Sequence, residues 1–401
     1  MADAEHSVPY DRNRNCPVCG GYAPKLLFAQ RFESLSNGIL SGYDLCVCTI
    51  CGAGYADHIP PQDVFDAYYR DASKYEYHQR AGTPSPADEK RFEETAELLS
   101  KEIGGRKTRV LEIGCATGSL LSKLKKMGFE NLVGVDPSPA CAEIARRQHG
   151  LEAFAHTIFD MPKFDGGFDF VIFIGVLEHI ENVNLAIGKL AEVLVPQGRA
   201  FVEVPDASRL GGLVDAPYQE FSVEHINFFS CHSLNNAMQM RGFRTLSSGE
   251  LLRPQNERTT VPAAYGFYEK TGQVEKFVKD DTTEKGLSEY IRASEKVDRQ
   301  MRSVIEATVS SAQPIIVWGV GTHTQRLLAT NGLDRANIVA FVDSNTKYQG
   351  RSLHGLPVLS PDSLKQRSEP ILISSRGFQN EIESQIRNTL GLKNPVIKLY
   401  Q

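Results

Sequence analysis

The stretch Val110-Leu111-Glu112-Ile113-Gly114-Cys115-Ala116-Thr117-Gly118 joins a short apolar run to a glycine-flanked turn. The apolar residues in 109–113 predict a buried strand, and the leucine spacing in 119–127 predicts a helix directly after the turn. Gly114 and Gly118 can take backbone angles that other residues resist, and the start of a helix offers unpaired N–H groups to an anionic ligand. The stretch therefore predicts an α/β fold with a binding loop for a nucleotide-type ligand.

The glycines that are missing from this loop narrow the class of ligand. A dinucleotide-binding turn has the pattern G-x-G-x-x-G, in which the second glycine makes room for a pyrophosphate. Ala116 and Ser119 occupy the second and third glycine positions here, which disfavours a pyrophosphate. Asp136 ends the next apolar run, roughly 20 residues on, where a carboxylate can bind ribose hydroxyls. We expect a ligand that carries a ribose and no pyrophosphate.

The loop resembles that of the class I methyltransferases, which use S-adenosylmethionine as the methyl donor. The pattern of that family, an acidic residue followed by G-x-G/A-x-G and later by the ribose-binding acid, is matched by Glu112, Gly114, Ala116, Gly118 and Asp136. The resemblance continues through residues 168–173, 175–180 and 194–205, in the order that the family has them. It implies a Rossmann-like core, S-adenosylmethionine as the cofactor, and these five residues as its contacts.

Two later segments of the core contain further candidate site residues. Phe159 and Asp160 follow the strand after which the family contacts the adenine ring, so they are assigned to the cofactor as well. Glu178-His179 lies just after a central strand, on the edge where open α/β sheets bind ligands. We consider His179 as a catalytic residue, with a purely structural role in the loop as the alternative.

Composition limits the classes of partner. The chain has 401 residues, 41% of them hydrophobic, which is enough for more than one core. A formal net charge of -5 gives no general attraction to nucleic acid, so we expect none as substrate. The first residues lack the pattern of a signal peptide, and no apolar run reaches the roughly 18 residues of a membrane span. We expect a soluble, cytoplasmic enzyme for a small molecule.

Cysteines gather near the start of the chain in two C-x-x-C-G motifs. Cys16 and Cys19 form the first motif, and Cys48 and Cys51 form the second. Each pair can direct two thiolates to one tetrahedral ion, so the four predict a structural Zn²⁺ site with no open position for catalysis. Cys46 is a spare that could replace Cys48. The alternative is a group of free, buried cysteines.

A tyrosine-rich segment at 64–77 follows the second cysteine motif. Tyrosine combines an apolar face with a polar tip, which suits a lid over a sugar or a cofactor. Tyr77 is assigned as a substrate contact on this basis. Ordinary packing between domains explains the tyrosines nearly as well.

The segment 218–230 places Glu224-His225 beside several aromatic residues. A histidine has an unperturbed pKa of about 6.5 and can remove a proton at neutral pH. We therefore expect His225 as a general base, with Glu224 orienting it or binding the substrate. Ser230 is a good N-cap for a helix that begins at Cys231. The alternative is that His225 merely anchors this helix.

A second α/β unit begins at residues 314–318. Gly319 and Gly321 match the first two glycines of a dinucleotide-binding turn, and Asp343 ends the next predicted strand, 338–342, at the expected distance. The turn predicts either an NAD site or a phosphate-binding turn for a nucleotide-linked substrate. Lys347 and Arg351 follow in a loop that otherwise reads as solvated.

Taken whole, the order of segments resembles the three-domain sugar C-methyltransferases that act on nucleotide-linked deoxyketosugars. The predicted units are a zinc-binding domain (1–58), a tyrosine-rich lid and helical linker (59–103), a methyltransferase core (104–250), a helical connector (251–312) and a C-terminal Rossmann-like domain (313–401). The resemblance implies C-methylation, His225 as the base and a C-terminal unit that binds the nucleotide sugar. The residues assigned to the substrate are Tyr77, Ser222, Gly321, Lys347 and Arg351.

One departure from that family leaves alternatives open. The family's run of tyrosine, histidine, glutamate and histidine reads Ser222, Val223, Glu224 and His225 here, so one candidate base is absent. His225 could instead deprotonate a hydroxyl for O-methylation, and N-methylation is a further alternative. A transferase for a small molecule without a nucleotide, an NAD-dependent oxidoreductase centred on Gly319, and an inactive zinc-bearing scaffold are the remaining hypotheses.

Overall fold

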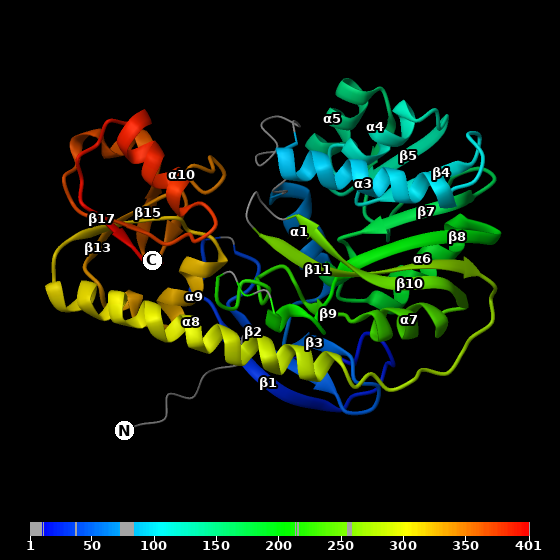
Figure 1. Cartoon of the computed structure of the whole chain (residues 1–401), viewed down its shortest axis with the longest axis horizontal. Helices are drawn as coiled ribbons and strands as arrows, with labels where there is room; N and C mark the ends of the chain where they lie inside the picture. The colour runs from blue at the N-terminus through cyan, green and yellow to red at the C-terminus, as the bar shows by residue number, and fades with distance from the viewer. Residues whose placement is uncertain are drawn as a thin grey trace.

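The computed structural model describes residues 10, 12–36, 38–72, 84–212, 214, 216–254 and 259–400, and it arranges them around three sheets (Figure 1). A seven-stranded sheet forms the core, a four-stranded sheet lies beside it, and a six-stranded sheet forms the C-terminal unit. A long helix, α8 (Thr283–Ser311), runs from the core to the C-terminal unit.

The core sheet is built around the strand that ends in the glycine turn. Its order is β10 (Phe243–Pro254), β11 (Thr260–Lys270), β8 (Leu194–Pro205), β7 (Phe168–Ile174), β4 (Arg109–Ile113), β5 (Asn131–Asp136) and β6 (Glu152–Ala155). β8, β7, β4, β5 and β6 are parallel, whereas β11 is antiparallel to both of its neighbours. The sheet is that of the predicted Rossmann-like core, and the carboxyl ends of its parallel strands, where such sheets bind ligands, lie on one edge.

Helices cover both faces of this sheet. One face packs against α3 (Pro86–Glu102), α4 (Ser119–Lys126) and α5 (Pro139–His149), and the other packs against α6 (Val183–Val193) and α7 (Cys231–Gln239). Local sequence fixes where these helices begin. Ser138 caps α5 by accepting the Cys141 N–H. Ser230 is the N-cap of α7, as predicted, and forms a capping box with Ser233.

The N-terminal sheet is completed by a strand from the core. Its order is β1 (Pro24–Arg31), β2 (Gly42–Cys48), β3 (Gly54–Asp57) and β9 (Asn227–Phe228), all antiparallel. α1 (Gln62–Ala72) follows β3 and leads toward the core. Because β9 begins two residues after His225, its pairing with β3 connects the N-terminal unit to the Glu224-His225 segment.

The C-terminal unit is a second Rossmann-like layer. Its sheet has the order β14 (Ser352–Leu353), β15 (Leu356–Leu359), β13 (Ile338–Val342), β12 (Ile315–Trp318), β16 (Ile371–Ile373) and β17 (Val396–Lys398). α9 (Thr322–Thr330) and α10 (Gln379–Ser384) accompany it, together with the short helices η3 (Leu333–Arg335), η4 (Pro361–Gln366) and η5 (Gln385–Thr389). The remaining short helices, η1 (Leu177–His179) and η2 (Leu210–Gly212), belong to the core.

The predicted helical connector at 251–312 needs correction at its start. β10 runs to Pro254 and β11 occupies Thr260–Lys270, so the core extends past residue 250 to about residue 270. This strand contains Pro262 and Gly266, two residue types that are uncommon within strands. Gly266 is needed within β11 because the Tyr268 ring covers it, and an added Cβ would lie 2.2 Å from the Tyr268 hydroxyl. The helical part of the prediction corresponds to α8.

In the part of the chain that the structure describes, no helix is both long enough and apolar enough to cross a membrane.

Candidate functional site

A cavity opens at the carboxyl ends of β4, β5 and β7, where the fold predicts a ligand. Gly114, Asp136 and Gly175 line it from the core sheet. Tyr69 lines it from α1, on the opposite side, together with Gln62 and Asp66. The cavity therefore lies between the glycine turn and the helix that follows the N-terminal sheet.

The glycine turn adopts backbone angles that explain its sequence. Gly114 and Gly118 have φ values of +78° and +77°, and Ala116 between them has +45°. A Cβ on Gly114 would lie 2.4 Å from Cγ2 of Val176, which is also a cavity residue. Close packing and left-handed angles therefore both require glycine at 114.

Asp136 fixes this turn from the neighbouring strand. One carboxylate oxygen accepts the Ala116 N–H at 2.8 Å, and the other accepts the Ser138 N–H at 2.9 Å. The carboxylate still lines the cavity, at the position where the sequence predicts contact with ribose hydroxyls.

Glu112 lies inside the core next to Asp136. Burial, followed by the charge of Asp136, raises the pKa of Glu112 to about 8. Its Oε2 atom is buried and has no hydrogen-bond partner among the described residues. Glu112 directly precedes Ile113 and Gly114, which line the cavity, and a cationic group bound there would favour the ionised form of its carboxyl.

Of the two residues assigned to adenine, Phe159 lies at the cavity and Asp160 stabilises a nearby loop. Phe159 lines the cavity, as do His156, Thr157 and Ile158, which the sequence analysis did not single out. Asp160 instead closes its own turn, because its Oδ1 accepts the Thr157 N–H at 2.6 Å and the Thr157 hydroxyl at 2.7 Å. Its hydrogen bonds to Thr157 lower the pKa of Asp160 despite partial burial.

His179 lines the same cavity, on η1 after β7. Its Nδ1 atom is 2.9 Å from the Tyr69 hydroxyl and 3.0 Å from the Glu224 carbonyl oxygen. A carbonyl can only accept, so this contact favours the tautomer in which Nδ1 carries the proton. The Nε2 atom then faces Glu178, whose Oε1 lies 3.8 Å away.

His225 stands beside His179 and forms a pair with it. The two ring centroids are 5.0 Å apart, and one polar atom from each of Glu178, His179 and His225 lies within 4.8 Å of the others. His225 itself is not among the residues that line the cavity. Glu224 does line it, and its Oε1 accepts the Tyr68 hydroxyl at 3.1 Å. The structure thus brings Glu224, His225 and His179 together, with His179 nearer the cavity.

The residues assigned to the substrate have different environments. Ser222 Oγ accepts the N–H groups of Glu224 and His225, at 3.2 and 3.1 Å, and so shapes their turn. Tyr77 lies outside the described residues. Arg351 acts electrostatically on Tyr68: burial raises the pKa of Tyr68, Glu224 and Tyr348 raise it further, and Arg351 offsets part of the rise.

Gly321 lies in the glycine turn of the C-terminal unit, and Lys347 lies on the loop that follows β13. Val320, between the two glycines, donates its N–H to Asp343 at 3.0 Å, just as Ala116 does to Asp136. Lys347 donates its own N–H to Asn345 Oδ1 at 3.0 Å. The chain therefore contains two turns of the same local design, one in each Rossmann-like unit.

The four predicted cysteines meet in one cluster. The Sγ atoms of Cys16 and Cys51 are 3.5 Å apart, those of Cys19 and Cys48 are 3.6 Å apart, and all four lie within 4.8 Å of one another. Cys46 is buried on β2, outside this group, and burial raises its pKa to about 12. Cys48, and not Cys46, is therefore the third member of the cluster.

Sequence reasoning missed the polar residues that α1 contributes to the cavity: Gln62, Asp66 and Tyr69. The tyrosine-rich pattern pointed to this segment but could not select Tyr69 over its neighbours. The selecting contact, with His179, joins residues 110 positions apart.

Comparison with known families identifies two domains. Residues 87–248 match the model described as a methyltransferase domain, and residues 311–397 match the model described as the N-terminal domain of C2185-like proteins. The first range contains the glycine turn, His179 and His225, and the second contains the C-terminal glycine turn.

Three curated relatives illustrate the range of similarity. The C-methyltransferase NovU of Streptomyces niveus is 24% identical over 339 residues, which cover 80% of this chain and 76% of NovU. The O-methyltransferase cnsE of Penicillium expansum is 26% identical over 175 residues, covering 40% of this chain and 63% of its own. A ubiquinone biosynthesis O-methyltransferase of a Chelativorans species is 35% identical over 100 residues, covering 23% of this chain and 39% of its own. Of these three, NovU is the one matched over most of both chains.

Proposed function

The protein is an S-adenosylmethionine-dependent methyltransferase with its methyltransferase domain at 87–248, and we propose that it transfers the methyl group to a carbon atom of a nucleotide-linked deoxyketosugar. The observation that carries this proposal is the histidine pair, His179 and His225, beside the cavity at the glycine turn. The similarity to the C-methyltransferase NovU over 80% of the chain supports the class of reaction.

In the proposed reaction His225 removes a proton from the carbon next to the sugar ketone. The resulting enolate carbon attacks the methyl group of the sulfonium, the carbon–sulfur bond breaks, and S-adenosylhomocysteine leaves. His179 positions the acceptor side of the cavity, because its ring contacts both His225 and the Glu224 backbone. Glu224 binds the sugar or orients His225, with the Tyr68 hydroxyl holding its carboxylate.

The cofactor is proposed to occupy the cavity at the first glycine turn, with Gly114, Ala116 and Gly118 forming the loop. Asp136 would bind the ribose hydroxyls, and Phe159 would contact the adenine. Glu112 fits the cationic end of S-adenosylmethionine, because its buried Oε2 lacks a partner among the described residues. Asp160 would contribute to cofactor binding indirectly, by holding the turn at Thr157, which lines the cavity.

The nucleotide of the acceptor is assigned to the C-terminal unit. Gly321 is the N-cap of α9, whose first N–H groups could bind a phosphate, and the charge of Arg351 acts on Tyr68, the partner of Glu224. Lys347 lies on the loop between Asp343 and Arg351. Ser222 would contact the sugar only through the turn that it shapes.

The alternative is O-methylation, in which His225 deprotonates a hydroxyl instead of a carbon. Val223 and Ser222 replace two polar residues of the C-methyltransferase pattern, and cnsE, another relative, is an O-methyltransferase. N-methylation of an amino sugar uses the same donor and the same base.

The deciding experiment supplies S-adenosylmethionine with a ¹³C-labelled methyl group and a panel of nucleotide-linked ketosugars. Mass spectrometry identifies a methylated product, and the ¹³C shift separates a methyl on carbon from one on oxygen or nitrogen. Calorimetry with the nucleoside diphosphate alone measures whether the C-terminal unit binds it. Label on oxygen establishes the alternative, and no binding of any nucleoside diphosphate contradicts the nucleotide-linked acceptor. Quenching of Trp318 fluorescence by NADH would instead favour an oxidoreductase, because Trp318 ends the strand before the second glycine turn.

We further propose that Cys16, Cys19, Cys48 and Cys51 bind one structural Zn²⁺. Sulfur pairs 3.5 and 3.6 Å apart approach the roughly 3.8 Å that Zn–S bonds of about 2.3 Å imply in a tetrahedral site. Four protein ligands leave no open position, so the ion would stabilise the N-terminal unit.

Cys48→Ser is expected to abolish stoichiometric zinc binding and to lower the free energy of unfolding by more than about 3 kcal/mol. Cys46→Ser is the matched control, because Cys46 lies two residues away on the same strand and outside the cluster. Metal analysis and denaturant unfolding of both variants test the assignment. Full zinc content in Cys48→Ser, or its loss in Cys46→Ser, would show that the ligand set is wrong.

Glu112→Gln is expected to remove part of the pH dependence of stability. The folded-state pKa of Glu112, about 8, exceeds its unfolded value of 4.5, so this group's contribution to stability is complete below pH 4.5 and is lost as pH rises to about 8. At pH 9 the variant should therefore be more stable than the wild type, by about 5 kcal/mol at most. The same variant should bind S-adenosylmethionine more weakly, since it lacks the carboxylate.

Unfolding curves between pH 4.5 and 9 measure this difference, and Glu130→Gln, an exposed glutamate of the same unit, serves as control. Binding of the cationic cofactor should also release a proton from Glu112 at neutral pH, which calorimetry in two buffers of different ionisation enthalpy detects. Parallel stability curves for wild type and Glu112→Gln would refute the burial argument.

A further inference from the structure

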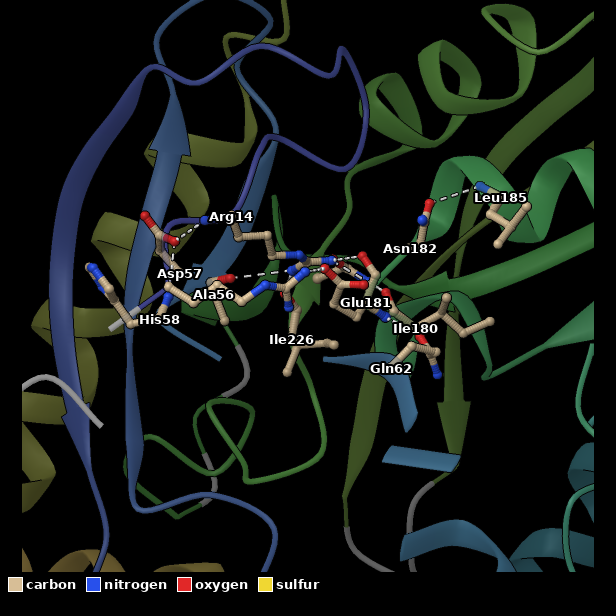
Figure 2. A network of polar contacts seen from close by, with 12 residues as sticks. Arg14, Ala56, Asp57, His58, Gln62, Ile180, Glu181, Asn182, Leu185 and Ile226 are labelled. Atoms are coloured by element: carbon tan, nitrogen blue, oxygen red, sulfur yellow. Dashed lines mark hydrogen bonds and ion pairs between the residues drawn. The ribbon is translucent and has the colours of Figure 1, made fainter. Parts of the chain in front are cut away.

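Arg14 is a buried arginine that joins the N-terminal unit to the core. It lies two residues before Cys16, and only 3% of its surface is exposed. Its guanidinium extends from the N-terminal sheet into the core, where backbone carbonyls surround it (Figure 2). Its own N–H donates to Asp57 Oδ1 at 2.6 Å, which fixes the start of the side chain on β3.

The acceptors of this guanidinium come from both histidine-bearing segments. Nη1 donates to the carbonyl of Ile226, at 3.0 Å, and Nη2 donates to the carbonyl of Ile180, at 3.3 Å. Ile180 directly follows His179, and Ile226 directly follows His225. Nη2 also donates to the carbonyl of Glu181, and Nη1 to that of Ala56 at 3.2 Å.

Asn227 completes the connection. Its Oδ1 accepts from Arg14 Nη2 at 2.7 Å, while its Nδ2 donates to the carbonyls of Leu177 and Ile180, at 2.6 and 2.7 Å. The Ile226 N–H donates to the Glu178 carbonyl at 2.8 Å. The backbone on both sides of the histidine pair is therefore tied to one guanidinium, whose planar fork of donors matches several carbonyls at once.

The cysteine cluster fixes the other end of this connection. Cys16, two residues after Arg14, pairs with Cys51 across the cluster, and β3 with its Ala56 carbonyl follows Cys51. A metal bound there would lock the turn from which Arg14 departs. This cluster and the helices α6 and α7 also share one hydrophobic core.

We propose that Arg14 is a positioning residue through which the four-cysteine cluster sets the spacing of His179 and His225 for proton transfer. The proposal rests on the proposed function, because it assumes that the histidine pair serves the reaction. Arg14 touches neither substrate nor cofactor in this view. It acts by holding the carbonyls of Ile180 and Ile226 in place.

The test compares Arg14→Lys and Arg14→Met with Arg12→Met in the full-length, zinc-loaded protein. Arg12 is the matched control, because its Nη2 also contacts Glu181, through the carboxylate and at an exposed site (3.0 Å). Lysine keeps the positive charge of Arg14 but cannot reach several carbonyls with one planar group. Arg14→Lys therefore separates an effect of positioning from an effect of charge. It also keeps the test informative if Arg14→Met fails to fold.

The first readout needs no acceptor substrate. Imidazole NMR of protein labelled at histidine Cε1, assigned with His179→Asn and His225→Asn, reports the environment of each ring. We expect both resonances to shift in Arg14→Lys and Arg14→Met and to stay unchanged in Arg12→Met. Removal of zinc from the wild type by a chelator should shift the same two resonances.

The second readout is steady-state kinetics with the acceptor that the labelled-methyl screen identifies. Arg14→Lys should lower kcat roughly tenfold, since small misplacement of reacting groups is costly, while the Kd for S-adenosylmethionine changes little. Unchanged resonances in a folded, zinc-loaded Arg14→Lys variant would overturn the proposal. If the histidines prove unimportant for turnover, the shifts still establish the positioning, so failure of the proposed function is distinguishable from failure of this one.

Discussion

His225→Ala is expected to lower turnover by about 100-fold or more, since a general base contributes roughly 10²- to 10⁴-fold. The Kd for S-adenosylmethionine should stay close to the wild-type value, because His225 does not line the cavity at the glycine turn. Single-turnover kinetics with labelled S-adenosylmethionine separates the chemical step from cofactor binding.

His179→Asn is the informative partner of this variant. His179 lines the cavity, so its replacement should weaken cofactor binding as well as turnover. If His179 is the base, His179→Asn will show the larger loss of the chemical step and His225→Ala the smaller one. His232→Ala, an exposed histidine on α7, controls for removal of a histidine in general. Near-normal turnover in His225→Ala would end its assignment as the base.

Gly114→Ala is expected to weaken S-adenosylmethionine binding by about tenfold to 100-fold. A left-handed angle costs an ordinary residue about 1–2 kcal/mol, and each 1.4 kcal/mol is a factor of about ten in Kd. The backbone strain at a φ of +78° and the steric overlap of the new methyl group, 2.4 Å from Val176 Cγ2, both oppose the native turn, so the turn must move. Calorimetric titration with S-adenosylmethionine measures the effect.

Two controls make this prediction specific. Gly188→Ala also adds a methyl group to the core unit, but an added Cβ there meets nothing within 4 Å, so it should leave binding unchanged. Gly114→Ala combined with Val176→Ala removes the overlap and keeps the backbone strain, so it should recover part of the affinity. Wild-type affinity in Gly114→Ala alone would show that the cofactor does not depend on this turn.

The parts of the fold that depend on local pattern were predictable from sequence. The apolar run 109–113, the glycines of the turn and Asp136 lie close together along the chain, and their order is enough to indicate a strand, a binding turn and a ribose acid. Ser230 as the N-cap of α7 is confirmed for the same reason. Strand β11 lies inside the segment predicted as a helical connector, because Pro262 and Gly266 are uncommon within strands and the Tyr268 ring that covers Gly266 is known only from the folded sheet.

The sequence identifies most residues of the candidate site, but it does not predict how they are arranged. Glu224 and His225 are adjacent in sequence, yet the contacts that place His179 at the cavity join it to Tyr69, 110 positions away, and to Glu224, 45 positions away. Arg14 reaches Ile226 over 212 positions. No periodicity or spacing encodes such contacts, because hydrogen bonds to backbone carbonyls place no demand on the type of the accepting residue.

The strand that completes the N-terminal sheet also sets an order of events during synthesis. β1 to β3 have been made by Asp57, but their partner β9 begins at Asn227, about 170 residues later. At about 5–20 residues per second, the ribosome needs roughly 10 to 30 s to supply it. During that interval the edge of β3 is unpaired and can template contacts with other chains. All four cysteines of the cluster have been made by Cys51, so the proposed Zn²⁺ site would be available before the histidine-bearing loops exist.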